Sequence, residues 1–172
     1  MTDRSARNNL FTARAFGIPF VLAIVCVLLY APTFSYPFIN YDDPVFVPDN
    51  PHVNQGLTAD GVRWAFGIHG PSQYHPLTWL SHMLDVQLFG VSPGAHHAVN
   101  VVLHTATTVL LYHLLLGMTA ATWRSAAVAA LFGWHPTRVE SVAWIAERKD
   151  LLCGLFVILT LIAYMRYVRR PG

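Results

Sequence analysis

Two adjacent carboxylates, Asp42 and Asp43, are the side chains whose type and position most directly suggest chemistry. They lie in the stretch INYDDPVFVPDNP, a few residues after an apolar segment long enough for a membrane helix. Acidic groups at a membrane boundary are costly and are commonly functional. A carboxylate placed there can accept a proton from a hydroxyl nucleophile, which makes the pair a candidate general base. The alternative is that both acids cap a turn and face water.

The nine histidines raise the question of a metal site, but their spacing does not favour one. His96 and His97 are adjacent, so they cannot face one point from a helix. His82 and Asp85 lie at helical spacing and could form a site, although a hydrogen bond between helices or at the surface is the simpler interpretation. We therefore expect no metal ligands and no required cofactor, with a divalent ion as the less favoured alternative.

The composition is that of a multi-span membrane protein. Of 172 residues, 54% are hydrophobic and only 12% are charged, outside the usual range of a soluble domain. A net charge of +2 is too small to indicate a nucleic-acid partner, and the basic residues gather at the ends of apolar segments. Both cysteines lie within apolar segments, so no disulfide framework is expected.

Four apolar stretches predict an all-α integral membrane fold with about four transmembrane helices. The third is expected to be short or kinked, because His135 and Pro136 interrupt it. Arginines precede the first stretch and follow the last, so the positive-inside rule places both ends in the cytoplasm. The predicted helices are 15–34, 96–116, 125–136 and 151–168; the cytoplasmic segments are 1–14, 117–124 and 169–172; the external segments are 35–95 and 137–150. A cleaved signal peptide is the competing interpretation of the N-terminus, but the apolar run is longer than a signal core.

The external loop 35–95 is too long and too aromatic for a bare linker, so we expect it to fold. Thr58 can cap a short helix, and Pro76 begins a second one that runs to about Phe89. The second helix has leucines on one face and is expected to lie on the membrane surface. Within the next span, a polar stripe should point into the helix bundle: His97, Asn100 and His104.

Three ordered stretches together resemble one family. They are NYDDPVFVPDNP, then HPLTWLSHMLDVQLFG with PGAHHAVNVVLH, then ALFGWHPTRVESVAWIAERKDLLCGLF. This combination, from about Phe38 to Tyr167, is similar to the N-terminal membrane part of tetratricopeptide-repeat-containing protein O-mannosyltransferase-like proteins. That family shares the C-type glycosyltransferase fold.

The resemblance implies an enzyme that takes a sugar from a polyprenyl-phosphate carrier on the external membrane face. The sugar would be mannose and the acceptor a Ser or Thr hydroxyl of a protein, with inversion at the anomeric carbon. Asp42 matches the family's base and Asp43 is its neighbour. Cations for the donor phosphate would be Arg148, Lys149, Arg138 and His135, oriented by Glu140 and Glu147. Candidates for lining the substrate site are Tyr74, Trp79, His97, Asn100 and His104; tryptophans near a boundary are equally explained as membrane anchors.

Relatives of this kind have further spans and C-terminal repeats, so we expect missing C-terminal spans or repeats, or a partner chain. The rival function is a truncated, non-catalytic membrane anchor or assembly module of the same fold. A transporter or channel is weaker, because the polar groups gather at one boundary instead of lining a path. The simplest location is a bacterial inner membrane, with membrane lipid as a partner.

Overall fold

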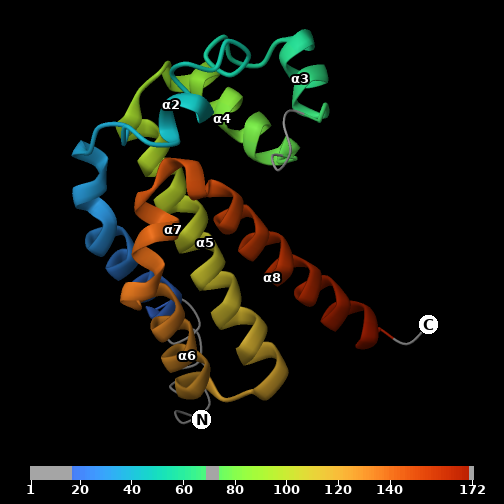
Figure 1. Ribbon diagram of the computed structural model, residues 1–172. Helices are drawn as coiled ribbons and strands as arrows, with labels where there is room; N and C mark the ends of the chain where they lie inside the picture. Colours follow the sequence, from blue (N-terminus) through green and yellow to red (C-terminus); the bar gives the residue numbers. More distant parts are fainter. Residues whose placement is uncertain (1–16, 69–73, 171–172) are drawn as a thin grey trace, which may run out of the picture.

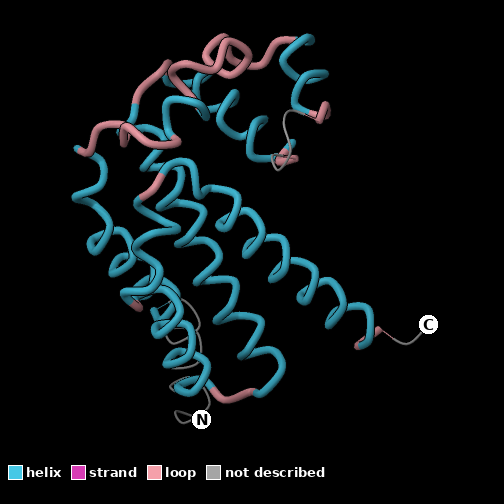
Figure 2. Tube along the Cα trace, viewed as in Figure 1, coloured by secondary structure: helices cyan, strands magenta, loops and turns pink. Residues whose placement is uncertain are grey.

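The computed structural model describes residues 17–68 and 74–170, and every regular element within them is a helix (Figures 1 and 2). The predicted all-α membrane fold is therefore confirmed. The predicted cytoplasmic segment 1–14 lies outside the described residues. The described chain forms a bundle of long helices with a smaller layer folded over one end (Figure 1).

Among the described residues, three helices are long and apolar enough to cross a membrane: Gly17–Ser35, α5 (Pro93–Thr119) and Ile145–Val168. The first ends in the 3-10 turn η1 (Ala31–Ser35), and the last comprises η3 (Ile145–Glu147) and α8 (Arg148–Val168). They correspond to the predicted spans 15–34, 96–116 and 151–168. Span α5 begins three residues earlier than expected, because Pro93 occupies the first turn, where a missing N–H costs nothing.

The expected short third span is α6 (Thr122–Trp134), whose 13 residues extend about 20 Å and cannot alone cross a core of about 30 Å. His135 has extended backbone angles, as expected for a residue before proline. After this break, η2 (Pro136–Arg138) and α7 (Val139–Ala143) continue toward the end where the folded layer lies (Figure 1). The His135 ring stabilises the new turn by accepting the Thr137 N–H at 3.3 Å.

The layer over the bundle end is formed by the described part of residues 36–92, and we call it the loop layer. It contains α2 (Asp43–Phe46), α3 (Ala59–Ala65) and α4 (Pro76–Phe89). Thr58 caps α3 as predicted, accepting the Gly61 N–H at 3.0 Å. The core of the loop layer includes Ile145 and Ala146, so the turn η3 is part of it.

Helix α4 has the predicted bounds, and its leucine face is largely exposed. Leu77, Leu84 and Leu88 are exposed, as a helix face on a lipid surface requires. The opposite face is buried and carries polar as well as apolar groups: Thr78, Trp79, His82, Met83, Asp85 and Val86. The periodic leucines therefore mark the outer face of α4, and its inner face holds residues with no simple apolar period.

Gly133 in α6 sits where a side chain has no room. A Cβ built there would lie 2.6 Å from Thr108 Cγ2 and 3.0 Å from Cys26 Sγ, so this residue lets α6 approach α5 and the first helix. We expect Gly133→Ala to destabilise the bundle by about 1–3 kcal/mol through overpacking. The measurement is the free energy of unfolding in detergent.

The matched control for this change is Gly154→Ala in α8. The nearest atom to its added Cβ would be Thr107 Cγ2 at 3.9 Å, an ordinary contact. Because alanine favours helix over glycine by about 1 kcal/mol, this variant should be neutral or more stable. Equal stability of the two variants would show that α6 is not packed as described.

Candidate functional site

The two aspartates of the motif have different surroundings. Asp43 is completely buried, whereas Asp42 is half-buried. Asp43 Oδ2 accepts the backbone N–H of Ile39 at 2.8 Å, and its Oδ1 accepts that of Ala146 at 3.0 Å. One carboxylate thus closes the turn that enters α2 and joins the loop layer to η3. Its geometry is that of a positioning group.

Asp42 is the residue before α2, but its side chain makes no capping hydrogen bond there. Within 17–68 and 74–170, no hydrogen bond or ion pair engages its carboxylate. The flanking residue Tyr41 packs its ring 5.9 Å from the ring of Trp144, at an interplanar angle of 44°. Asp42 therefore stands at the junction of loop layer and bundle with its oxygens uncommitted, which is the condition a proton acceptor needs.

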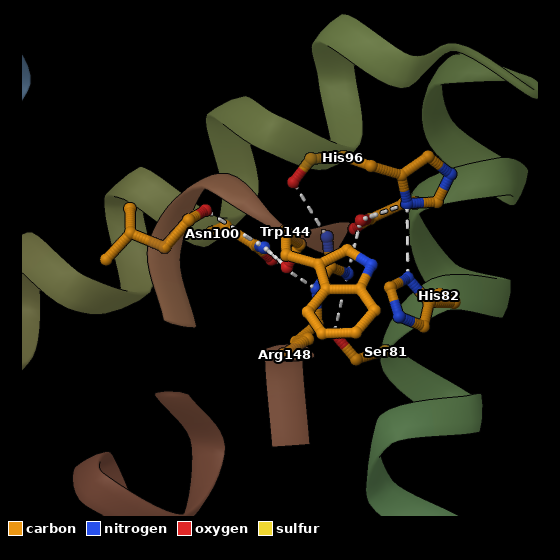
Figure 3. A network of polar contacts seen from close by, with 8 residues as sticks. Ser81, His82, His96, Asn100, Trp144 and Arg148 are labelled. Atoms are coloured by element: carbon orange, nitrogen blue, oxygen red, sulfur yellow. Dashed lines mark hydrogen bonds and ion pairs between the residues drawn. The ribbon is translucent and has the colours of Figure 1, made fainter. Parts of the chain in front are cut away.

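Arg148, the first residue of α8, is fully buried and lies in the centre of a polar network (Figure 3). Its Nε donates to Asn100 Oδ1 at 2.7 Å and its Nη2 to the His96 carbonyl at 2.8 Å, both on α5. Its Nη1 donates to the Ser81 hydroxyl at 3.0 Å and to Asp85, both on α4. The guanidinium thus joins three helices, and few of its donors are left for a ligand.

Asn100 extends this network to the turn that follows α7. Its amide Nδ2 donates to the carbonyls of Val142 and Trp144, each at 3.3 Å. The predicted polar stripe of α5 therefore does face the bundle interior, and Figure 3 shows Asn100 directed toward Trp144 and Arg148. Both the oxygen and the nitrogen of the Asn100 amide are hydrogen-bonded within the protein. This favours a structural role over contact with a sugar.

A compact group of ionisable side chains adjoins Arg148, formed by His82, Asp85 and His96. His96 Nδ1 lies 3.0 Å from Asp85 Oδ2 and 3.2 Å from His82 Nδ1, and all three residues are buried. Burial, together with the positive charge of Arg148 and the adjoining His96, holds the pKa of His82 well below its usual 6.5. His82 is therefore the neutral imidazole at physiological pH.

Lys149 and Glu147 form a close ion pair beside α2. Lys149 Nζ lies 2.7 Å from Glu147 Oε1, and the two side chains retain 30% and 17% of their exposure. The ammonium also lies 5.9 Å from the centre of the Phe46 ring, in α2. The structure thus brings Lys149 to the helix that directly follows Asp42, with a charge that remains accessible.

Arg138 lies in a different place, on a small pocket of about 140 Å³ lined by residues of α5, α6, α7 and α8. Its guanidinium covers the Phe132 ring at 4.5 Å. Ser141 and Asp150 share this pocket, and the Ser141 hydroxyl donates to Asp150 Oδ2 at 3.4 Å. His135 is exposed and bonded to Thr137, and Glu140 is exposed. These residues therefore do not converge with Arg148 on one point.

The remaining candidates for a substrate surface are divided between core and solvent. Trp79 is buried and stacks on Phe46 at 4.7 Å, so its faces are not available to a sugar. Tyr74 is exposed. His104 is buried and its Nε2 donates to the Gly133 carbonyl at 2.9 Å, while buried His97 contacts the Tyr36 ring edge at 6.2 Å.

The sequence interpretation gave no role to Ser81, Asp85 or His96 in organising the site. The only signals were the i, i+3 spacing of His82 and Asp85 and the isolation of an acid on an otherwise uncharged helix. A buried acid of this kind requires a cation, and Arg148 supplies it from 63 residues away. Nothing local in the sequence identifies that partner.

Comparisons with known proteins give consistent relatives. The chain is 32% identical over 163 residues to mouse "Protein O-mannosyl-transferase TMTC1", covering 87% of this chain and 17% of that protein. It is 35% identical over 152 residues to the Drosophila melanogaster Tmtc2 protein of the same description, covering 83% and 16%. For human TMTC4 the identity is 28%, covering 91% and 24%.

No family model matches the chain, and no solved structure gives a significant match. The chain spans less than a quarter of the length of each relative described here. The matches nonetheless extend over most of this chain, and the three relatives carry the same description. The three motifs and these similarities agree: the chain is similar to a region of the TMTC protein O-mannosyl-transferases, and its long apolar helices are those of a membrane protein.

Proposed function

We propose that this chain supplies the general base and part of the donor site of an enzyme that transfers mannose from a polyprenyl phosphate to protein Ser or Thr hydroxyls. The names of the relatives support mannosyl transfer to protein, and the membrane helices suit a lipid-linked donor. The rival of a non-catalytic anchor is less favoured, because these relatives are named as transferases. The rest of the site would come from further spans or a partner chain.

In the proposed reaction, Asp42 accepts the proton of the acceptor hydroxyl as its oxygen attacks the anomeric carbon. The new carbon–oxygen bond forms on the face opposite the phosphate. The bond from that carbon to the phosphate oxygen breaks, and the phosphate leaves with the electron pair. One proton is transferred to Asp42 and the configuration at the anomeric carbon inverts. No metal or redox cofactor is needed for this balance.

The observation that carries this proposal is that, in the described part of the chain, Asp43 is fully hydrogen-bonded to the backbone whereas Asp42 is not. Asp43 uses both carboxylate oxygens to hold the backbone through hydrogen bonds. The adjacent Asp42 is therefore held in position, and its own oxygens make none of these bonds. Such preorganisation lets a base act without reorganising during the reaction. Asp43, Arg148 and Asn100 are then positioning residues, and Asp42 is the catalytic residue.

Lys149 is our primary candidate for the donor phosphate. It remains accessible, and Glu147 orients it beside α2. Arg138 is the second candidate, because its pocket is of a size for a small polar group such as phosphate. Arg148 is a poor candidate in its predicted role, because its buried donors already serve four protein acceptors. His135 and Glu140 lack a position that supports a specific role.

The proposed topology places the loop layer and residues 137–150 on the external or lumenal side and both ends of the chain in the cytoplasm. Basic residues at both ends of the sequence support this orientation. The relatives described above are animal proteins, so they give no support to a bacterial inner membrane. Glycosylation acceptor tags placed in the loop layer and after α8 would determine the sidedness.

The experiment that tests the function uses the full-length protein, reconstituted with labelled polyprenyl-phosphate mannose and a Ser/Thr-rich acceptor peptide. Formation of a mannosylated peptide with the anomeric configuration opposite to that of the donor is the expected result. Absence of product with every peptide acceptor, or hydrolysis of donor without peptide product, would contradict protein O-mannosylation.

We expect Lys149→Gln to raise the KM for the lipid-linked donor about 10- to 100-fold, the effect of losing one hydrogen bond to a charged group. The kcat should change less, because the base is untouched. Steady-state kinetics at varied donor concentration measure both values. Arg170→Gln, an exposed cation at the far end of the chain, is the control; equal KM values in the two variants would remove Lys149 from the donor site.

A further inference from the structure

We propose that His82, Asp85 and His96 bind one divalent metal ion of the zinc type, which fastens α4 to the start of α5. Figure 3 shows the rings of His82 and His96 facing each other. One ligand atom from each residue lies within 4.8 Å of the other two. Two imidazoles and one carboxylate are a ligand set that zinc commonly uses. The inference concerns the fold and does not depend on the transfer reaction.

Two of the three ligand–ligand distances match a shared ligand shell. With metal bonds of about 2.0–2.1 Å, tetrahedral ligand atoms lie about 3.3 Å apart. The two measured edges, 3.2 Å between the imidazole Nδ1 atoms and 3.0 Å from His96 Nδ1 to Asp85 Oδ2, are close to this value. Three protein ligands leave one tetrahedral position for a water molecule.

The protons of the two imidazoles also favour an ion. A neutral imidazole carries one N–H, so His96 Nδ1 cannot donate to Asp85 and also accept from His82. Either one hydrogen on His96 Nδ1 is shared between Asp85 and His82, or lone pairs face each other in one of these two contacts. Both Nε2 atoms are buried and have no hydrogen-bond partner within 17–68 and 74–170. A cation at the centre would satisfy the two Nδ1 lone pairs and the carboxylate together.

Local structure presents the three ligands together. His82 and Asp85 are one helical turn apart on the buried face of α4, and His96 lies in the first turns of α5. Only the short turn through Gly90 connects the two helices, and Gly90 adopts the positive φ of 70° that this turn requires. The ligands are therefore held by rigid elements, as a metal site requires.

Arg148 limits the strength of this site. Its Nη1 donates to Asp85 Oδ2, and carboxylates that bind metals are often held by such neighbours. The positive guanidinium also repels a second cation in surroundings of low dielectric constant. We therefore expect weaker binding than in a site without the arginine, and chelators should remove the ion.

The test uses the full-length protein purified through a histidine-free tag, stripped with EDTA and dialysed. It is then equilibrated with Zn²⁺ or Co²⁺, and bound metal is measured by mass spectrometry while cobalt absorption reports the coordination geometry. We expect one ion per chain with a tetrahedral cobalt spectrum, lost in His82→Gln. The control is His97→Gln, which removes a buried imidazole outside the cluster and should retain the ion.

Two results would overturn the proposal: wild type that binds no more metal than His82→Gln, or His97→Gln that loses the ion equally. If His82→Gln does not fold, the proposal is tested by the response of the wild-type protein to added metal. Added Zn²⁺ should raise the midpoint of its thermal unfolding after EDTA treatment, in proportion to the logarithm of the ion concentration. Wild type with no bound ion and no shift of the midpoint would exclude the site.

Discussion

Asp42→Asn is expected to lower the kcat for mannosyl transfer by about 100- to 10,000-fold, the usual contribution of a positioned general base. Asparagine has nearly the same shape as aspartate but cannot accept the proton of the acceptor hydroxyl. The KM values for donor and peptide should change little, since the proposed loss occurs in the transition state. The measurement is single-turnover transfer by full-length protein reconstituted with lipid-linked mannose.

Asp49→Asn provides the matched control, because Asp49 is an exposed acid of the same loop and the substitution is chemically identical. It should leave transfer unchanged. Asp43→Asn offers a further comparison: it weakens the bonds to Ile39 and Ala146, so it should lower thermal stability as well as activity. Asp42→Asn with wild-type turnover and unchanged stability would remove this residue from the mechanism.

Arg148→Met is expected to destabilise the protein by about 3–5 kcal/mol, because it leaves the Asp85 carboxylate buried without its cation. The same change also deprives Ser81, Asn100 and the His96 carbonyl of a donor. The free energy of unfolding in detergent, measured in the presence of EDTA, reports the loss. Arg166→Met in the same helix is the control, and exposed substitutions of this kind commonly change stability by no more than about 0.5 kcal/mol.

A double variant separates the cost of an unpaired charge from a general loss of packing. Replacing both partners, Arg148→Met with Asp85→Leu, should recover much of the stability, because paired burial of charge is often no better than apolar packing. If the double variant recovers no stability, the loss in Arg148→Met comes mainly from the hydrogen bonds of Arg148 to α5. An Arg148→Met protein as stable as Arg166→Met would contradict the buried network itself.

Local rules of sequence predicted much of this fold. Apolar length gave the three long helices, Thr58 and Pro76 marked the starts of α3 and α4, and His135 with Pro136 marked the break after α6. These features depend on capping, proline geometry and hydrocarbon thickness, which act within a few residues. They need no knowledge of tertiary partners.

The site was less predictable because its decisive contacts join distant residues. Adjacent charges such as Arg148 and Lys149 look equivalent in the sequence, yet one is fully buried and the other is accessible. The rotation of α8 about its axis decides whether Arg148 or Lys149 points toward α4. That rotation is set by tertiary packing and not by the local sequence. For the same reason, neither Asp43 nor Asp42 could be assigned the structural bond to Ala146 from the motif alone.

The bond between Asp43 and Ala146 also has a consequence for biogenesis, since the two residues are separated by 103 positions. At about 5–20 residues per second, the ribosome needs roughly 5–20 s to add the intervening chain. Throughout that interval Asp43 lacks its bond to Ala146, although Phe46 of the same segment can already pack on Trp79. The attachment of the loop layer to η3 must therefore follow synthesis of the turn before the last span, so this layer is completed in two steps.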